Sequence, residues 1–330
     1  MLAVVGALVM GVVGCGGGDD KPGGTNIALV TPGTRDDVDW TRQTTNAAEA
    51  AAKKLHVRAA IVEGSADDPV KPVLRRLARN AQLVVAPFVG DREAAIQVAQ
   101  STEVPALVWG DPDALRPGLV GDIEADLAHG AYAAGVIAIH ASIERSVGIV
   151  LCDDGTAPMT ERFALAAAYL AGARSVEPKT KATYVISGSD VASAKLGTLE
   201  VVKRGGQMIF AVCGTAAPGV LQGVEQAVKK VETGETQLVG LIGDKGTINK
   251  ANVVLTSVMV NPQKAIEQAV RDIKAGTFGK RVYTLDLKNG GITLLQTGRT
   301  PGDAYQAGID APQPAELPTA VDEHELDALI

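Results

Sequence analysis

The chain has 330 residues, of which 46 % are hydrophobic and 21 % charged, a globular composition long enough for two lobes. The net charge is −7, aromatic residues make up only 3 %, and no more than two basic residues are adjacent. These features argue against nucleic acid as a partner, because phosphate neutralisation needs a basic surface and base stacking needs aromatic rings. No apolar run reaches the ~20 residues that cross a bilayer, which argues against an integral membrane protein.

The first residues form an uncharged, almost wholly apolar segment. Residues 1–14 match the apolar core of a signal peptide, although the basic residues that usually begin one are missing. An apolar pair and a small residue precede Cys15, as in a bacterial lipobox. We expect a diacylglycerol thioether on Cys15, cleavage before it, and a flexible tether over 15–25. The alternative is a buried N-terminal helix with an inert cysteine.

From residue 26 onward, short apolar runs alternate with longer segments of helical periodicity, which is typical of parallel βαβ units. The pattern restarts near residue 127, so the sequence predicts two similar doubly wound sheets in series. The expected strands are 27–31, 57–63, 83–88 and 105–109, then 147–151, 183–186, 208–212 and 238–242. The expected helices are 41–55, 70–80 and 92–100, then 127–142, 159–171, 191–204 and 219–232.

The pattern changes after residue 253. We expect a strand, a helix and two further strands around Asn289-Gly290-Gly291, which is typical of a hairpin turn. The four elements are 253–259, 262–275, 282–287 and 292–295. They complete neither sheet alone, so we infer that this part of the chain crosses back between the lobes. The first lobe then comprises 26–125 and about 258–284, the second comprises 126–257 and about 285–299, and 300–330 form an extended or loosely docked acidic tail.

Polar residues that follow the expected strands are the candidates for ligand binding, because ligands of doubly wound sheets bind beyond the carboxyl ends of the strands. The candidates are Asp36, Asp37, Trp40 and Asp111 in the first lobe and Asp153, Asp154, Thr215, Asp244 and Lys245 in the second. Each type has a structural alternative: the first two aspartates as helix caps, the tryptophan as a hydrophobic staple, and the Asp153-Asp154 pair as turn residues. Their shared position at one edge of two sheets favours binding in a cleft that closes about a hinge.

An ordered series of motifs points to a known family. Residues 36–42, DDVDWTR, are similar to D-D-x-S-F-N-Q, and residues 157–163, APMTERF, are similar to I-P-x-I-x-x-F, which adds Phe163 to the candidates. Residues 210–221, 255–266 and 287–291 are similar to A-G-G-T-G-x-G-V, L-T-S-V-x-K-x-x-x-x-A-V and L-K-N-G-G. Over roughly residues 26–297 the chain thus resembles the basic membrane protein family, the PnrA-like nucleoside-binding lipoproteins of ABC importers.

The resemblance implies a type I periplasmic-binding-protein fold, with two doubly wound parallel-sheet lobes joined by a multi-strand hinge. It implies a nucleoside or related small polar molecule in the cleft, with Trp40 against the base. It also implies a protein on the extracytoplasmic face of the cell membrane, held by its lipid anchor, that delivers this ligand to ABC permease subunits without any cofactor.

Three positions depart from the family pattern. Pro32 replaces an aspartate, and Ile242 and Val260 replace an aspartate and a lysine that serve the ribose hydroxyls. A buried hydroxyl without a partner costs about 1–3 kcal/mol, so these changes bear on ligand identity. The alternative function is a membrane-anchored ligand sensor or regulator of the same fold that has lost nucleoside binding.

Cys152 and Cys213 follow strands that are adjacent in a doubly wound sheet. They form either a disulfide, which is favoured outside the cytoplasm, or two buried thiols that behave as small apolar residues. The four histidines show no metal-ligand spacing, and the sequence contains no Walker loop, G-x-S-x-G elbow or H-E-x-x-H motif. We therefore expect neither a metal site nor an enzyme.

Overall fold

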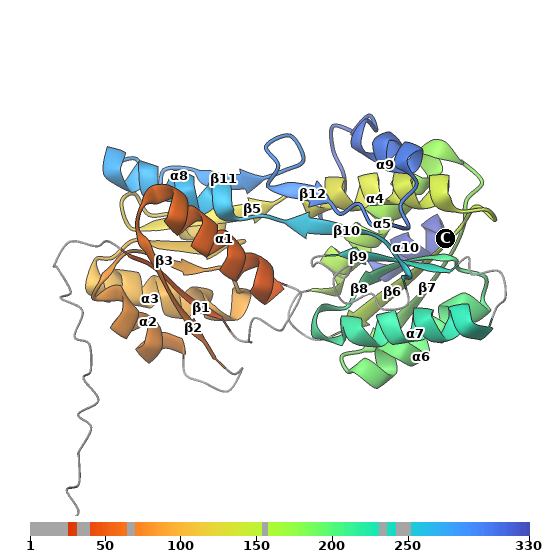
Figure 1. Cartoon of the computed structure of the whole chain (residues 1–330), viewed down its shortest axis with the longest axis horizontal. Coiled ribbons are helices and arrows are strands. Elements are labelled where there is room, and N and C mark those ends of the chain that lie inside the picture. Colours follow the sequence, from red (N-terminus) through yellow and green to blue (C-terminus); the bar gives the residue numbers. More distant parts are fainter. Residues whose placement is uncertain (1–25, 32–39, 65–69, 154–157, 231–235, 242–251) are drawn as a thin grey trace, which may run out of the picture.

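The computed structural model describes residues 26–31, 40–64, 70–153, 158–230, 236–241 and 252–330. It consists of two α/β lobes, each built on a six-stranded sheet, which lie side by side in Figure 1. This arrangement confirms the predicted fold class. Among the described residues, no helix combines the length and the apolar character needed to cross a membrane.

The first lobe contains a wholly parallel sheet with the strand order β11-β5-β4-β3-β1-β2. Its strands are β1 (Asn26–Thr31), β2 (Arg58–Glu63), β3 (Ala81–Ala86), β4 (Ala106–Trp109), β5 (Val120–Ala125) and β11 (Val282–Leu285). Helices α1 (Trp40–Leu55) and α8 (Gln263–Ala275) cover one face, and α2 (Val70–Ala78) and α3 (Arg92–Thr102) cover the other. Because both faces are covered, β1 is a continuous apolar run rather than an alternating one.

The second lobe contains a sheet with the order β12-β10-β9-β8-β6-β7, in which only β12 is antiparallel to its neighbour. Its strands are β6 (Ser146–Asp153), β7 (Lys181–Gly188), β8 (Met208–Val212), β9 (Gln237–Leu241), β10 (Val254–Val260) and β12 (Ile292–Leu294). Helices α4 (Leu127–Ala141) and α5 (Met159–Val176) lie on one face, and α6 (Val191–Lys203) and α7 (Ala217–Lys230) lie on the other.

Helices α4 and α5 approach each other unusually closely. A Cβ atom added to Gly135 on α4 would lie 2.0 Å from the carbonyl oxygen of Tyr169, and one added to Gly172 on α5 would lie 1.9 Å from that of Tyr132. The same stretch of α5 positions Tyr169 in the core, where its ring stacks on Phe210 at 4.5 Å between centroids. Glycine at these two positions therefore permits backbone-to-backbone packing that no larger residue allows.

The chain crosses between the lobes three times: between β5 and α4, between β10 and α8, and between β11 and β12. Backbone hydrogen bonds join the crossovers, from Asp126 N–H to the Leu285 carbonyl and from Asn261 N–H to the Gly291 carbonyl, both 2.8 Å. The inferred return between lobes is therefore present. The predicted hairpin is wrong, because β11 and β12 pair with different sheets rather than with each other.

Two further features differ from the expectations drawn from the sequence. Strand β5 was not predicted, because Asp122 and Glu124 interrupt its apolar run. Strand β10 remains in the second sheet as far as Val260, past the boundary expected at 257.

The C-terminal tail is docked on the second lobe rather than extended or loose. Helix α9 (Gly302–Ile309) packs against α4, and α10 (Glu323–Leu329) packs against α5. Val321 and Leu326 are buried, and Val321 N–H donates to the Thr160 carbonyl at 3.0 Å. The acidic composition of the tail favours an extended chain, but a few apolar residues among the acids are enough to fix it on the lobe.

We predict that Gly135→Ala lowers the free energy of unfolding by about 2–3 kcal/mol or more, because α4 and α5 must separate to admit the methyl group. Chemical denaturation followed by circular dichroism measures the change. Gly302→Ala is the matched control, since an added Cβ there meets nothing within 4 Å and its effect should stay within about 0.5 kcal/mol. Equal effects of the two substitutions would contradict the packing argument.

Candidate functional site

The candidate site consists of the carboxyl ends of the parallel strands in the two lobes, where such sheets bind ligands. Asp111 follows β4, Asp153 ends β6, Thr215 lies in the 3-10 turn Gly214–Ala216 after β8, and Trp40 is the first residue of α1. The side chains of Trp40 and Thr215 are not among the described features. The predicted residues Asp36, Asp37, Asp154, Asp244 and Lys245, the departures Pro32 and Ile242, and Cys15 lie outside the described residues.

Asp111 is held in a small polar network at the edge of the first sheet. Its backbone N–H donates to Asp122 Oδ1 at 2.9 Å, and its Oδ2 lies 3.5 Å from Arg92 Nε. Arg92 also donates from Nη1 to the carbonyl oxygens of Trp109 at 3.2 Å and Gly110 at 2.7 Å. The arginine thus fixes the loop after β4 and neutralises part of the charge of the carboxylate that this loop carries.

Two buried aspartates that sequence reasoning missed lie in this part of the first lobe. Asp122 on β5 is 0 % exposed and Asp91, at the start of α3, is 8 % exposed, and no described residue bonds to Oδ2 of either. Burial raises the pKa of each to about 6. For Asp122 the Asp111 N–H bond acts against this rise in pKa, the charge of Glu124 adds to it, and Arg92 opposes it. For Asp122, the feature of the sequence that could have revealed it is an acidic residue within the otherwise apolar start of β5.

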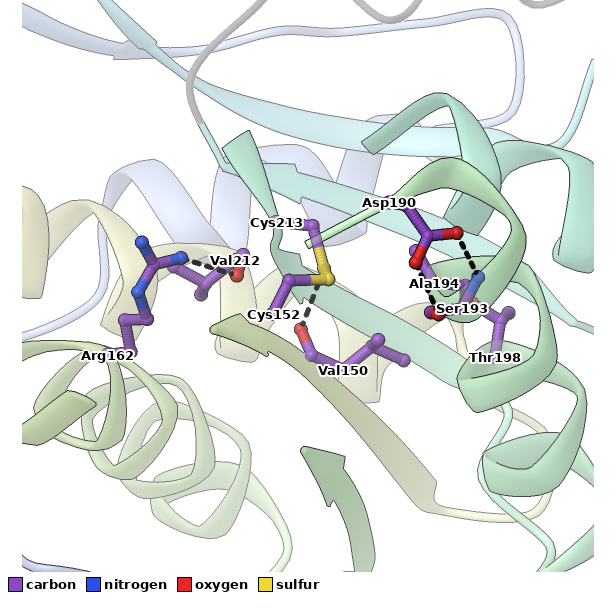
Figure 2. The surroundings of a disulfide bond; sticks show 9 residues. All are labelled: Val150, Cys152, Arg162, Asp190, Ser193, Ala194, Thr198, Val212 and Cys213. Atoms are coloured by element: carbon purple, nitrogen blue, oxygen red, sulfur yellow. Dashed lines mark hydrogen bonds between the residues drawn. A yellow bond between two sulfur atoms is a disulfide. The ribbon is translucent and has the colours of Figure 1, made fainter. Parts of the chain in front are cut away.

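The edge of the second sheet carries a disulfide between Cys152, on β6, and Cys213, after β8, with Cα atoms 4.6 Å apart (Figure 2). Both residues are buried. The bond ties together the carboxyl ends of two adjacent strands, from which Asp153 and Thr215 follow directly. It therefore restricts the relative movement of two segments that carry candidate binding residues.

Arg162 is a third residue that sequence reasoning missed. It lies on the first turns of α5, is only 5 % exposed, and donates from Nη1 to the Val212 carbonyl at 3.2 Å (Figure 2). A buried guanidinium at the end of β8 connects α5 to the same strand end as the disulfide. Its neighbour Phe163, a predicted ligand contact, is 5 % exposed and packs in the main core. The structure thus shows a packing role for Phe163, and its binding role stays a prediction.

One side-chain hydrogen bond joins the lobes at this edge. Gln43, one turn into α1, accepts through Oε1 from the Val260 N–H at the end of β10, at 3.1 Å. The Val260 side chain is buried and apolar, so it cannot supply the ammonium group that the motif resemblance implies at this position. The Gln43 Nε2 group is buried and has no hydrogen-bond partner among the described residues.

The described residues contain no cluster of three histidine, cysteine, aspartate or glutamate side chains suited to a metal ion. The polar groups at the two edges are carboxylates, guanidinium groups and an amide. Such groups can donate hydrogen bonds to, and accept them from, the hydroxyl and amine groups of a polar ligand.

Comparisons with known proteins define the class of the chain. A family model described as ABC transporter substrate-binding protein PnrA-like matches residues 24–309, and no curated protein matches. The fold is that of a solute-binding protein with two parallel-sheet lobes. The chain belongs to the PnrA-like family of ABC transporter substrate-binding proteins.

Solved structures with the same fold include three solute-binding proteins. The chain is 24 % identical to an ABC transporter solute-binding protein from Conexibacter woesei, with 87 % of this chain and 94 % of that chain covered and a TM-score of 0.68. For one from Aeropyrum pernix the identity is 17 %, the coverage 93 % and 85 %, and the TM-score 0.66. A periplasmic solute-binding protein from Actinobacillus succinogenes with bound D-allose is 17 % identical to this chain. The match covers 84 % of this chain and 99 % of that chain, with a TM-score of 0.59.

We predict that Asp122 makes the protein less stable as pH rises. Its pKa is raised from 3.8 to about 6 on folding, so the folded state holds a proton more tightly than the unfolded state. The contribution of Asp122 to the free energy of unfolding is therefore largest below pH 4. It falls as pH rises through 6, by up to about 3 kcal/mol in total. Asp122→Asn keeps an oxygen acceptor for Asp111 N–H but cannot ionise.

Urea denaturation at pH 4 and at pH 7.5 measures this effect. The stability of the Asp122→Asn protein relative to the wild type should increase between the two pH values. The exposed Asp113→Asn change in the neighbouring loop is the control and should give the same difference at both pH values. A pH-independent effect of Asp122→Asn would show that folding does not raise the pKa of this carboxyl.

The disulfide should stabilise the second lobe. The bridged residues are 61 positions apart, and closing a loop of this size contributes about 2–4 kcal/mol to stability. Cys152→Ala/Cys213→Ala should lower the midpoint of thermal unfolding, and a reductant should lower that of the wild type but leave the double variant unchanged. A wild-type midpoint insensitive to reductant would contradict the pairing.

Proposed function

We propose that the protein is a lipid-anchored, extracytoplasmic binding protein that captures a nucleoside or related polar molecule between its lobes and delivers it to an ABC permease. Membership of a substrate-binding family carries this proposal, since that family supplies ligands to ABC transporters. The lipid anchor at Cys15 rests on the lipobox resemblance. The Cys152–Cys213 disulfide supports a location outside the reducing cytoplasm.

The proposed binding mode uses the edges of both sheets. Trp40 stacks on the flat base, because an indole offers the largest apolar ring face among side chains. Asp111 and Asp153, at the ends of β4 and β6, accept hydrogen bonds from ligand hydroxyl and amine groups. The three crossovers allow the lobes to close over the ligand as a hinge, in the manner expected of two-lobed binding proteins.

The ligand contacts on the ribose side must differ from the family pattern. Val260 presents no polar side chain, and its backbone N–H is already bound by Gln43. The amide nitrogen of Gln43, which has no partner among the described residues, is a donor that can take over part of this role. We therefore expect binding that depends more on the base than on the sugar.

The test is isothermal titration with purine and pyrimidine nucleosides and with free bases, after unfolding and refolding to remove any carried ligand. We expect micromolar or tighter binding to at least one of them. Trp40→Ala should weaken it on the order of tenfold or more, through loss of stacking and buried area. Trp40→Phe retains a flat ring and should recover most of the affinity.

The absence of heat with any nucleoside or base, from a protein shown to be folded by circular dichroism, would reject the nucleoside proposal. That result would favour the sensor function, in which the fold is retained and the ligand has changed. Turnover of a nucleoside during the titration would instead indicate an enzyme.

A further inference from the structure

A groove of about 430 Å³ lies on the first lobe, outside the candidate ligand site. It runs between α8 and the edge strand β11, which lie beside each other at the end of the lobe in Figure 1. Four basic side chains from three parts of the chain line it: Lys54, Lys264, Arg271 and Arg281. This concentration of positive charge is unexpected in a chain with a net charge of −7.

Two buried carboxylates, Glu267 in the groove and Asp272 beside it, hold three of these cations in place. Glu267 Oε2 lies 2.7 Å from Lys54 Nζ and 3.6 Å from Arg271 Nη1, so a single oxygen draws two cations together. Asp272 Oδ2 lies 3.1 Å from Arg281 Nη2. Both carboxylates are buried, whereas the basic side chains reach solvent. The acids therefore orient the cations from below and leave their outer surfaces accessible.

Neutral side chains add further restraint. Gln268 Oε1 accepts from Nε and Nη2 of Arg271, at 3.1 and 3.0 Å, and its Nε2 donates to Asp272 Oδ1 at 2.7 Å. Arg281 lies against the ring of Tyr283, with its Cζ 5.7 Å from the ring centre. Each arginine thus has its orientation set before any ligand binds, which lowers the entropic cost of binding.

The charges in the groove do not cancel. Burial opposes ionisation of Glu267, but hydrogen bonds from Lys54 and Gln263 outweigh it and lower its pKa, so the group is an anion at neutral pH. The pKa of Asp272 is lowered in the same way, against burial, by Gln268 and Arg281 among others. Four cations are thus set against two carboxylates, which leaves these six side chains with a net charge of two positive.

We propose that this groove binds an anion of phosphate chemistry, either a free phosphate compound or the headgroup of an anionic lipid. Arginine presents planar N–H donors that match phosphate oxygens, and lysine adds a charge that follows the ligand. Arg281 contacts Asp272 through Nε and Nη2, and its Nη1 has no hydrogen-bond partner among the described residues.

The groove is separate from the proposed nucleoside site. Lys54 is near the C-terminal end of α1, whereas Trp40 begins that helix, and about 20 Å of helix lies between them. Lys264 also donates from Nζ to the carbonyl oxygen of Asn289 in the third crossover, so the groove reaches the segment that joins the lobes. The inference does not depend on the proposed function, and the two can fail independently.

Isothermal titration of the purified protein with inorganic pyrophosphate tests the proposal. We expect saturable binding with a dissociation constant below about 1 mM that weakens with added salt. Arg271→Gln/Arg281→Gln should weaken binding at least about tenfold, because two charge-assisted contacts are lost. Arg204→Gln is the matched control, since it removes an exposed arginine paired at 3.0 Å with a glutamate on α6, and should leave binding unchanged.

Thermal unfolding verifies that each variant is folded. If the double variant does not fold, Lys54→Gln replaces it, since this side chain is 62 % exposed and should still weaken binding several-fold. Nucleoside titration of the same variants should be unchanged. If the network serves only to attach α8 to its neighbours, the substitutions should lower the unfolding temperature, and the wild type should show no saturable pyrophosphate binding. That result would overturn the proposal.

Sedimentation with phospholipid vesicles distinguishes the two sources of phosphate. Binding to phosphatidylglycerol vesicles but not phosphatidylcholine vesicles, lost in the double variant and competed by pyrophosphate, would identify a lipid headgroup. Pyrophosphate binding without vesicle binding would identify a free phosphate compound. Binding of neither probe would reject the site.

Discussion

The three passages of the chain between the lobes are the constraint on which the rest of the structure depends. They are bonded to one another through the backbone, from Asp126 to Leu285 and from Asn261 to Gly291. Because α8 and β11 belong to the first lobe while β10 and β12 belong to the second, neither lobe is complete without a segment from the C-terminal third. The two sheet edges are therefore joined by several strands rather than by one flexible linker, which favours a defined hinge motion over free rotation.

The polar groups at these edges are held at an energetic cost. Asp91 and Asp122 are buried with an unbonded oxygen among the described residues, and burial raises the pKa of both. Across the lobes, Gln43 leaves its amide nitrogen unbonded while it bonds Val260. Proteins tolerate such groups where a bound ligand supplies the missing hydrogen bond or a proton neutralises the charge. Unsatisfied polar atoms therefore concentrate at functional sites. The disulfide on the second lobe offsets part of this cost by tying two strand ends together.

Charge is distributed unevenly over this acidic protein. Acidic residues follow the strands at the candidate ligand site, whereas basic residues gather in the groove between α8 and β11. In that groove the buried Glu267 and Asp272 orient the surrounding cations without cancelling them. The same side chains that attach α8 to α1 and β11 can thus prepare a positive surface, so a structural network and a binding site need not exclude each other.

Local sequence was sufficient for the alternation of strands and helices, the two-lobed architecture, the return between the lobes and the family, because hydrophobic periodicity and short motifs depend on residues close in the chain. Tertiary structure alone decided the partners of β11 and β12, whose shared turn sequence is typical of a hairpin, and the docking of the acidic tail through Val321 and Leu326. It also decided that acid-containing β5 is a buried strand and that Gln43 meets Val260. These features depend on residues that are far apart in sequence, and strand pairing and burial are settled only when the whole lobe packs.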